Sequence, residues 1–251
     1  MTVVEICVDD VRGARLAEAA GADRIELCSG LAEGGLTPSV GLVRRVLAET
    51  SGIGVNVILR PRGGDFVYPP DEAEVVCADA AELRRSEVGL VFGALTPAGE
   101  VDVAVVRRVR EANPDTNLTF HRAFDATVDL GRSLDLLVDL GVDRVLTSGG
   151  RATAVAGAEV LGALVRQAAG RIVVMAGGGV RADNVADLVA RTGVAEVHLR
   201  AVEKTPSASR FVNPALGYDD GFRLTTSADA IRAVRSALRA GASRKRAQSW
   251  R

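Results

Sequence analysis

Several short apolar stretches of this sequence contain or end in side chains that can transfer protons or bind metal ions. The candidate acids and bases are Glu5, Glu26, Asp65, His121 and His198. The thiols of Cys7 and Cys28 follow Glu5 and Glu26 by two residues, so in extended strands each thiol shares a face with the carboxylate before it. Carboxylates and imidazoles suit proton transfer or a hard metal ion, whereas thiolates suit Cu(I).

A second group of residues could bind a small anionic ligand. Arginine side chains would hold its charge, and glycine-rich turns after two later apolar runs would offer backbone N–H groups. The candidates are Arg60, Arg62, Arg122, Asp125, Thr147, Ser148, Gly149, Gly177, Gly178 and Gly179. We expect the ligand to be a small anionic molecule, such as a phosphorylated metabolite.

Buried carboxylates need partners, because an unpaired charge inside a protein is costly. We therefore expect Glu5 and Glu26 to pair with Arg60, Arg62 or His121. Such pairing is compatible with a structural network beneath a site or with catalysis by the same groups.

Two cofactor chemistries are not expected. Lys204 and Lys245 are the only lysines, and neither follows an apolar run, so Schiff-base chemistry and pyridoxal phosphate are disfavoured. Gly177-x-Gly179-x-x-Ala182 matches a dinucleotide fingerprint, but it lies late in the chain and Glu196 begins the next apolar run instead of ending it. We expect no NAD.

Alternating strand and helix patterns must position these residues. Strands are expected at 3–8, 24–28, 55–60, 90–95, 118–121, 144–147, 172–176 and 196–199, each followed by a helical stretch. Eight such units in 251 residues predict one α/β domain, a (β/α)₈ TIM barrel, over residues 1–242. Its active site would lie at the carboxyl ends of the strands. The basic segment 243–251 is expected to be a flexible tail, and 200–224 a long loop that acts as a lid or an oligomer contact.

Charge and composition indicate the surroundings of the protein. A net charge of −1 lacks the positive field that nucleic-acid binding needs, so no nucleic acid partner is expected. The sequence has no secretory signal pattern and no window of eighteen apolar residues. Its three cysteines are too few for a disulfide framework. We expect a cytoplasmic protein with no membrane association.

Motifs along most of the chain resemble the copper homeostasis protein CutC family. They are Glu5-Ile6-Cys7, Arg24-Ile25-Glu26-Leu27-Cys28, Glu33-Gly34-Gly35-Leu36-Thr37-Pro38-Ser39, Arg60-Pro61-Arg62-Gly63-Gly64-Asp65-Phe66, Thr119-Phe120-His121-Arg122-Ala123-Phe124-Asp125, Val145-Leu146-Thr147-Ser148-Gly149, Met175-Ala176-Gly177-x-Gly179-Val180 and Glu196-Val197-His198. The resemblance implies a cytoplasmic barrel, a homo-oligomer and a link to copper tolerance, with Cys7 and Cys28 as copper ligands. Leu199-Arg200 departs from the small or hydroxylated residues common after this histidine.

Three functions remain open from the sequence. The chain could be an enzyme that uses acid–base chemistry or a divalent metal, Mg²⁺ or Zn²⁺, on an anionic metabolite. It could bind Cu(I) through Cys7 and Cys28, or it could be an oligomeric scaffold without chemistry. The reaction and substrate are not specified by the residues, so whether the protein is an enzyme stays open.

Overall fold

Eight parallel strands close into a barrel, which confirms the expected (β/α)₈ TIM fold. The structure is a computed structural model that describes residues 1–84, 86–217 and 219–248. The barrel strands are β1 Val3–Val8, β2 Arg24–Leu27, β3 Gly54–Ile58, β4 Gly89–Phe92, β5 Leu118–Phe120, β6 Arg144–Thr147, β7 Val173–Gly177 and β8 Glu196–Leu199. Each pairs in parallel with the next, and β8 pairs with β1 to close the barrel.

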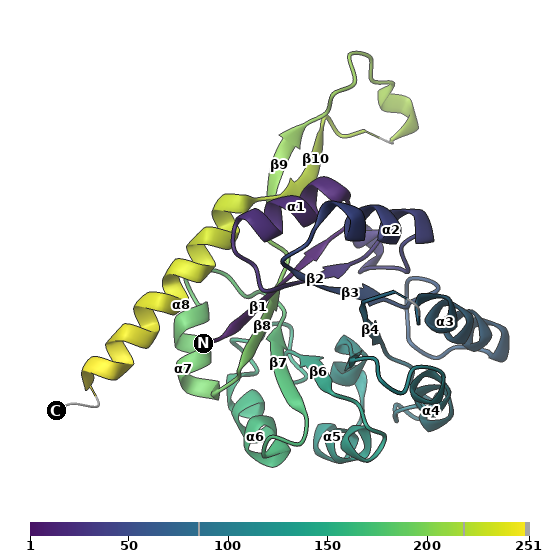
Figure 1. The fold of residues 1–251 in the computed structure, drawn as a ribbon, viewed down its shortest axis with the longest axis vertical. Coiled ribbons are helices and arrows are strands. Elements are labelled where there is room, and N and C mark those ends of the chain that lie inside the picture. The colour runs from purple at the N-terminus through teal and green to yellow at the C-terminus, as the bar shows by residue number, and fades with distance from the viewer. Residues whose placement is uncertain (85, 218, 249–251) are drawn as a thin grey trace.

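Helices surround the strands as a ring (Figure 1). They are α1 Val11–Ala19, α2 Val40–Glu49, α3 Pro70–Leu83, α4 Val103–Ala112, α5 Leu130–Asp139, α6 Ala158–Ala168, α7 Val185–Thr192 and α8 Ala228–Gln248, with short 3₁₀ turns η1 Leu31–Glu33, η2 Arg122–Ala126 and η3 Pro214–Leu216. Side chains cap several of them: Asp10 accepts from Gly13 N, and Asp129 accepts from Arg132 N at 3.0 Å. Among the described residues, no helix is both long and apolar enough to cross a membrane.

Strand ends differ from the expected ones by a few residues. The largest difference is in β4, expected to end at Leu95 but ending at Phe92. The chain leaves the barrel at Gly93, and Leu95 instead forms an antiparallel bridge with Val101. An apolar run continues there because the loop packs on the core, so hydrophobicity alone does not mark where the strand stops.

The long loop expected at 200–224 is wrong at its two ends, where strands form, and a connection over 207–221 remains between them. Strands β9 Val202–Pro206 and β10 Phe222–Thr226 pair in antiparallel fashion, and the hairpin projects beyond α1 in Figure 1. At the end of the chain, α8 continues to Gln248, so residues 243–248 of the expected flexible tail are helical. Residues 249–251 lie outside the described part of the chain.

Candidate functional site in the barrel mouth

Alternate residues of each strand point into the barrel. On β1, Val4, Ile6 and Val8 belong to the main core between strands and helices, whereas Cys7 belongs to a separate buried group with Cys28. The same alternation places Glu5 with Cys7, as the two-residue spacing predicts. The barrel interior is therefore lined by polar side chains in stacked layers.

Four charged side chains form the layer nearest the amino ends of the strands. These residues, here named the ion-pair layer, are Glu5, Arg24, Arg144 and Glu196. Arg24 donates to Glu5 through Nε and to Glu196 through Nη2. Arg144 forms a bidentate pair with Glu196, with Nε to Oε2 at 2.6 Å and Nη2 to Oε1 at 3.1 Å. Two glutamates and two arginines thus compensate one another.

The partners expected for Glu5 and Glu26 are wrong. Neither Arg60 nor Arg62 reaches these carboxylates, because both guanidiniums bind groups of the loops above the barrel. The strand register instead places Arg24 beside Glu5 on one side and His198 beside it on the other. Asn56 also donates to Glu5 Oε2 at 3.0 Å.

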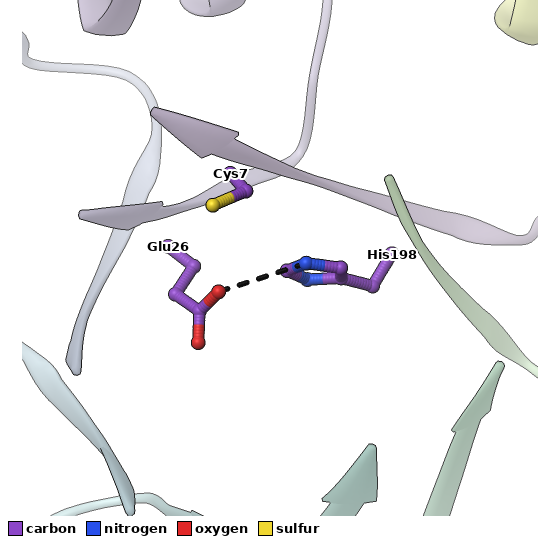
Figure 2. Close-up of side chains that lie close together, drawn as sticks. All are labelled: Cys7, Glu26 and His198. Carbon is purple, nitrogen blue, oxygen red and sulfur yellow. Dashed lines mark ion pairs between the residues drawn. The ribbon is translucent and has the colours of Figure 1, made fainter. Parts of the chain in front are cut away.

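The next layer, toward the carboxyl ends of the strands, is a cluster of four side chains. They are Cys7, Glu26, Cys28 and His198, named here the cysteine cluster. A thiol sulfur, a carboxylate oxygen and an imidazole nitrogen from Cys7, Glu26 and His198 lie within 4.8 Å of one another. Figure 2 shows these three side chains converging from β1, β2 and β8. The Sγ atom of Cys28 lies 3.6 Å from that of Cys7. This is the one group of potential metal ligands found among the described residues.

Glu5 orients His198 from below. Its Oε1 lies 2.8 Å from Nδ1 of the imidazole, so Nε2 faces the cysteine cluster and lies 3.6 Å from Glu26 Oε2. The carboxylate thereby fixes which ring nitrogen is available to a ligand. Glu5 belongs to both layers, because it also pairs with Arg24.

Burial, hydrogen bonds and neighbouring charges shift the pKa values of these side chains in different directions. The hydrogen bond with Cys28 lowers the pKa of Cys7 to about 6, against the effect of burial. Burial raises the pKa of Glu26 to about 8. Burial opposes the charge on His198, but its bonds to Cys7 and Glu5 outweigh that cost and raise its pKa. Burial also opposes the charge on Glu5, but His198 and Arg24 lower the pKa of this carboxyl to about 2.

His121 and Arg60 lie at the mouth but outside the cysteine cluster. Both are buried, and Phe66 packs against the two, with its ring 4.9 Å from the His121 ring and 5.1 Å from Arg60 Cζ. Burial and the charge of Arg60 lower the pKa of His121 to about 3. His121 is therefore neutral near pH 7, and its imidazole is a weaker base than that of an exposed histidine.

Arg62 and Asp65 lie in the loop above β3. Asp65 is exposed, accepts from Arg62 Nη2 at 3.0 Å and from Val67 N at 3.1 Å, and does not face the cysteine cluster. Arg62 also pairs with Glu72 at the start of α3. The structure thus places these two candidates in contacts that hold the loop.

The turn after β6, expected to receive an anion from a ligand, already holds a carboxylate of the protein. Asp125 accepts from Ser148 N at 3.0 Å, from Gly150 N at 2.9 Å and from Thr147 Oγ1 at 2.5 Å. Arg122 adds a bond to Asp125 at 2.8 Å. A separate anion would have to displace this side chain.

The glycines after β7 pack closely on their neighbours. Gly178 has a φ of +95°, and a Cβ there would lie 3.4 Å from Arg122 Cζ. At Gly177 a Cβ would lie 2.5 Å from Leu146 Cδ1. Both positions favour glycine for packing, and Gly179, with a φ of +72°, shares the positive φ.

Sequence reasoning missed the residues that pair with the candidates. Arg24, Arg144 and Glu196 lie two residues before Glu26, Leu146 and His198, so strand alternation could have placed them inside the barrel. Tyr68 is buried at the mouth, and no periodic signal marks it. At the end of β8, Leu199 packs in the main core between strands and helices. The charge of Arg200, the next residue, helps to lower the pKa of Cys7.

Comparisons with known proteins agree on one family. A model of the CutC family matches residues 2–203. A CutC protein of Xylella fastidiosa (strain Temecula1) is 45% identical over 241 residues, which cover 96% of this chain and 90% of the relative. One from Mesorhizobium japonicum is 44% identical over 218 residues, covering 86% and 84%. The crystal structure of a CutC protein from Streptococcus agalactiae, named for copper homeostasis, superposes with a TM-score of 0.74 at 35% identity, covering 79% of this chain and 98% of that one.

Proposed function

The chain belongs to the CutC family, and we propose that it binds Cu(I) between Cys7 and Cys28 at the carboxyl end of the barrel. The carrying observation is the 3.6 Å separation of the two Sγ atoms, which places two soft ligands beside one ion. Both thiols are buried, so a bound ion would be shielded from water and oxidants. The name of the Streptococcus agalactiae relative supports the same metal.

His198 would be the third ligand. Histidines that bind metals commonly donate the other ring N–H to a carboxylate, which orients the ring and raises its basicity. The Glu5 carboxylate at Nδ1 supplies this partner and leaves Nε2 facing Cys7. Glu26 supplies an oxygen, a harder ligand that Cu(I) favours less than sulfur.

A Cu(I) competition titration with a chromophoric chelator, under anaerobic conditions, tests this proposal. The wild type and a Cys77→Ser control, whose thiol lies on α3 outside the cluster, should bind one Cu(I) with equal affinity. The Cys7→Ser, Cys28→Ser double variant should lose this binding. If the double variant kept the wild-type affinity, the proposal would be wrong. A wild type that bound Zn²⁺ tightly and Cu(I) weakly would also contradict it.

A second candidate function is the binding or conversion of a small anionic metabolite at the mouth. Arg60 favours it, because this buried guanidinium forms no ion pair with a described carboxylate. The acid–base groups of the cysteine cluster would lie beneath the ligand. Solvent deuterium exchange into a panel of carboxylated and phosphorylated metabolites tests for turnover: exchange that Glu26→Gln abolishes supports an enzyme, and no exchange with any member contradicts catalysis.

A further inference from the structure

Arg60, at the mouth of the barrel, differs from the arginines inside the barrel. Arg24 and Arg144 each pair with carboxylates, whereas Arg60 binds only backbone carbonyls, through Nη1 to Glu33 O at 2.7 Å and through Nη2 to Gly64 O at 2.8 Å. Arg60 is only 6% exposed. Burial of a cation without a countercharge is costly, so an anion at this place would offset that cost.

Three buried polar atoms at the mouth have no hydrogen-bond partner. They are Arg60 Nε, Tyr68 Oη and His121 Nε2, named here the donor triad. Each side chain is at least nine-tenths buried, with 6%, 9% and 5% exposed. Buried polar groups in native proteins are nearly always bonded, so three together call for an explanation.

One aromatic ring contacts two of the three side chains. The centre of the Phe66 ring lies 5.1 Å from Arg60 Cζ and 4.9 Å from the centre of the His121 ring. Tyr68, two residues further along the same loop, lies under Arg62, with its ring 5.4 Å from Arg62 Cζ. Burial raises the pKa of Tyr68, and the charge of Arg60 and the approach of its guanidinium to the hydroxyl oppose that rise. Burial and the same charge lower the pKa of His121, so Arg60 lies close to both of the other side chains.

All three atoms of the donor triad are hydrogen-bond donors. Ala123 N donates to His121 Nδ1 at 3.1 Å, so the proton of the neutral ring is on Nε2. Neutrality follows from burial beside the Arg60 cation, which lowers the pKa of this imidazole. Arg60 Nε carries a hydrogen, and the Tyr68 hydroxyl can donate. A partner that satisfies all three must be an acceptor.

We propose that the donor triad is a binding site for one anionic oxygen group of a ligand, a carboxylate or a phosphate. Such a group accepts several hydrogen bonds at once and supplies the negative charge that Arg60 lacks. This inference rests on the second candidate function and adds to it the group that is recognised and a residue, Tyr68, that recognises it. It does not depend on whether Cys7 and Cys28 bind copper.

Calorimetric titration with inorganic phosphate and with malonate, each as a separate arm, tests the donor triad and distinguishes the two sources of the anion. The variants are Tyr68→Phe, which removes only the hydroxyl, and Arg60→Lys, which keeps the charge but removes Nε–H. Arg181→Gln is the control, because it removes an exposed positive charge after β7. Far-ultraviolet circular dichroism shows whether each variant is folded.

We expect the wild type and Arg181→Gln to bind at least one probe equally, and Tyr68→Phe to bind it about tenfold more weakly, the loss typical of one hydrogen bond to a charged group. Arg60→Lys should weaken binding at least as much. If the wild type binds and the folded Tyr68→Phe protein binds equally well, the donor triad is not the site, and the second candidate function survives. If the wild type binds neither probe, both are wrong.

Discussion

The ion-pair layer and the donor triad of the same barrel differ in whether their buried polar groups have partners. In the ion-pair layer every arginine faces a carboxylate, and Arg144 forms a two-pronged pair with Glu196. In the donor triad, Arg60 Nε, Tyr68 Oη and His121 Nε2 have no partner. A network in which every charge is paired stabilises the fold. Similarly buried donors without partners indicate a place for a ligand. The cysteine cluster lies between the two, with His198 oriented from below by Glu5 and the Cys7 and Cys28 sulfur atoms 3.6 Å apart.

The strongest test of this contrast removes one member of the ion-pair layer. Arg144→Met should lower the free energy of unfolding by about 3 kcal/mol, because it leaves Glu196 buried with less compensation. Arg171→Met, which removes an arginine from a half-exposed surface pair with Asp135, should cost less than about 1 kcal/mol. Urea unfolding of both variants measures the difference. Equal losses in the free energy of unfolding would show that the ion-pair layer contributes no more to stability than a surface ion pair.

Glu5→Gln tests the connection between the ion-pair layer and the cysteine cluster. Without the carboxylate, His198 loses the partner that orients its ring, and Cu(I) affinity should fall about 10- to 100-fold. The chelator competition titration measures it, on protein shown to be folded. An unchanged affinity would mean that His198 does not bind the metal.

His121→Asn tests the environment of the donor triad through pH. Because the pKa of His121 is lowered from 6.5 to about 3, the unfolded chain holds a proton that the folded protein lacks between these values. The wild type therefore loses stability as the pH falls through this window, by up to about 1.4 kcal/mol per pH unit from this group. Asparagine does not titrate, so the variant should lose less stability than the wild type as the pH falls. Urea unfolding at a series of pH values measures both losses. Parallel curves for the two proteins would place His121 in a solvated environment.

Tyr68→Phe should give the smallest change in stability and the clearest contrast with Arg144→Met. Its hydroxyl is buried without a partner, so its removal should leave the ligand-free protein equally stable or raise its free energy of unfolding by up to about 1 kcal/mol. Thermal unfolding checks the sign. A loss of more than about 1 kcal/mol would reveal a hydrogen bond in the folded protein and would remove Tyr68 from the donor triad.

The barrel and its inward faces were predictable from the sequence, because strand–helix alternation and the two-residue period are local properties. The hydrogen-bond and ion-pair partners of the candidate residues were not predictable. Glu5 meets His198 only because β8 closes on β1, and Asp125 reaches Ser148 only because two loops fold onto each other. These contacts depend on register and closure, which no single segment specifies.

The loops were the least predictable part. The strands β9 and β10 are separated by the long connection 207–221 instead of a tight two-residue turn, so their sequence resembles a long loop. Tyr68 is buried by the path of the loop after β3, without any repeat that marks it.

X-ray absorption at the copper edge of the Cu(I)-loaded protein tests the central claim most directly. The proposal predicts a first shell of two sulfur atoms and one nitrogen in the wild type and in Cys77→Ser. The two sulfurs should be absent in the Cys7→Ser, Cys28→Ser variant. A wild-type shell of nitrogen and oxygen alone, or one unchanged by the double substitution, would contradict the assignment of Cys7 and Cys28 as the copper ligands.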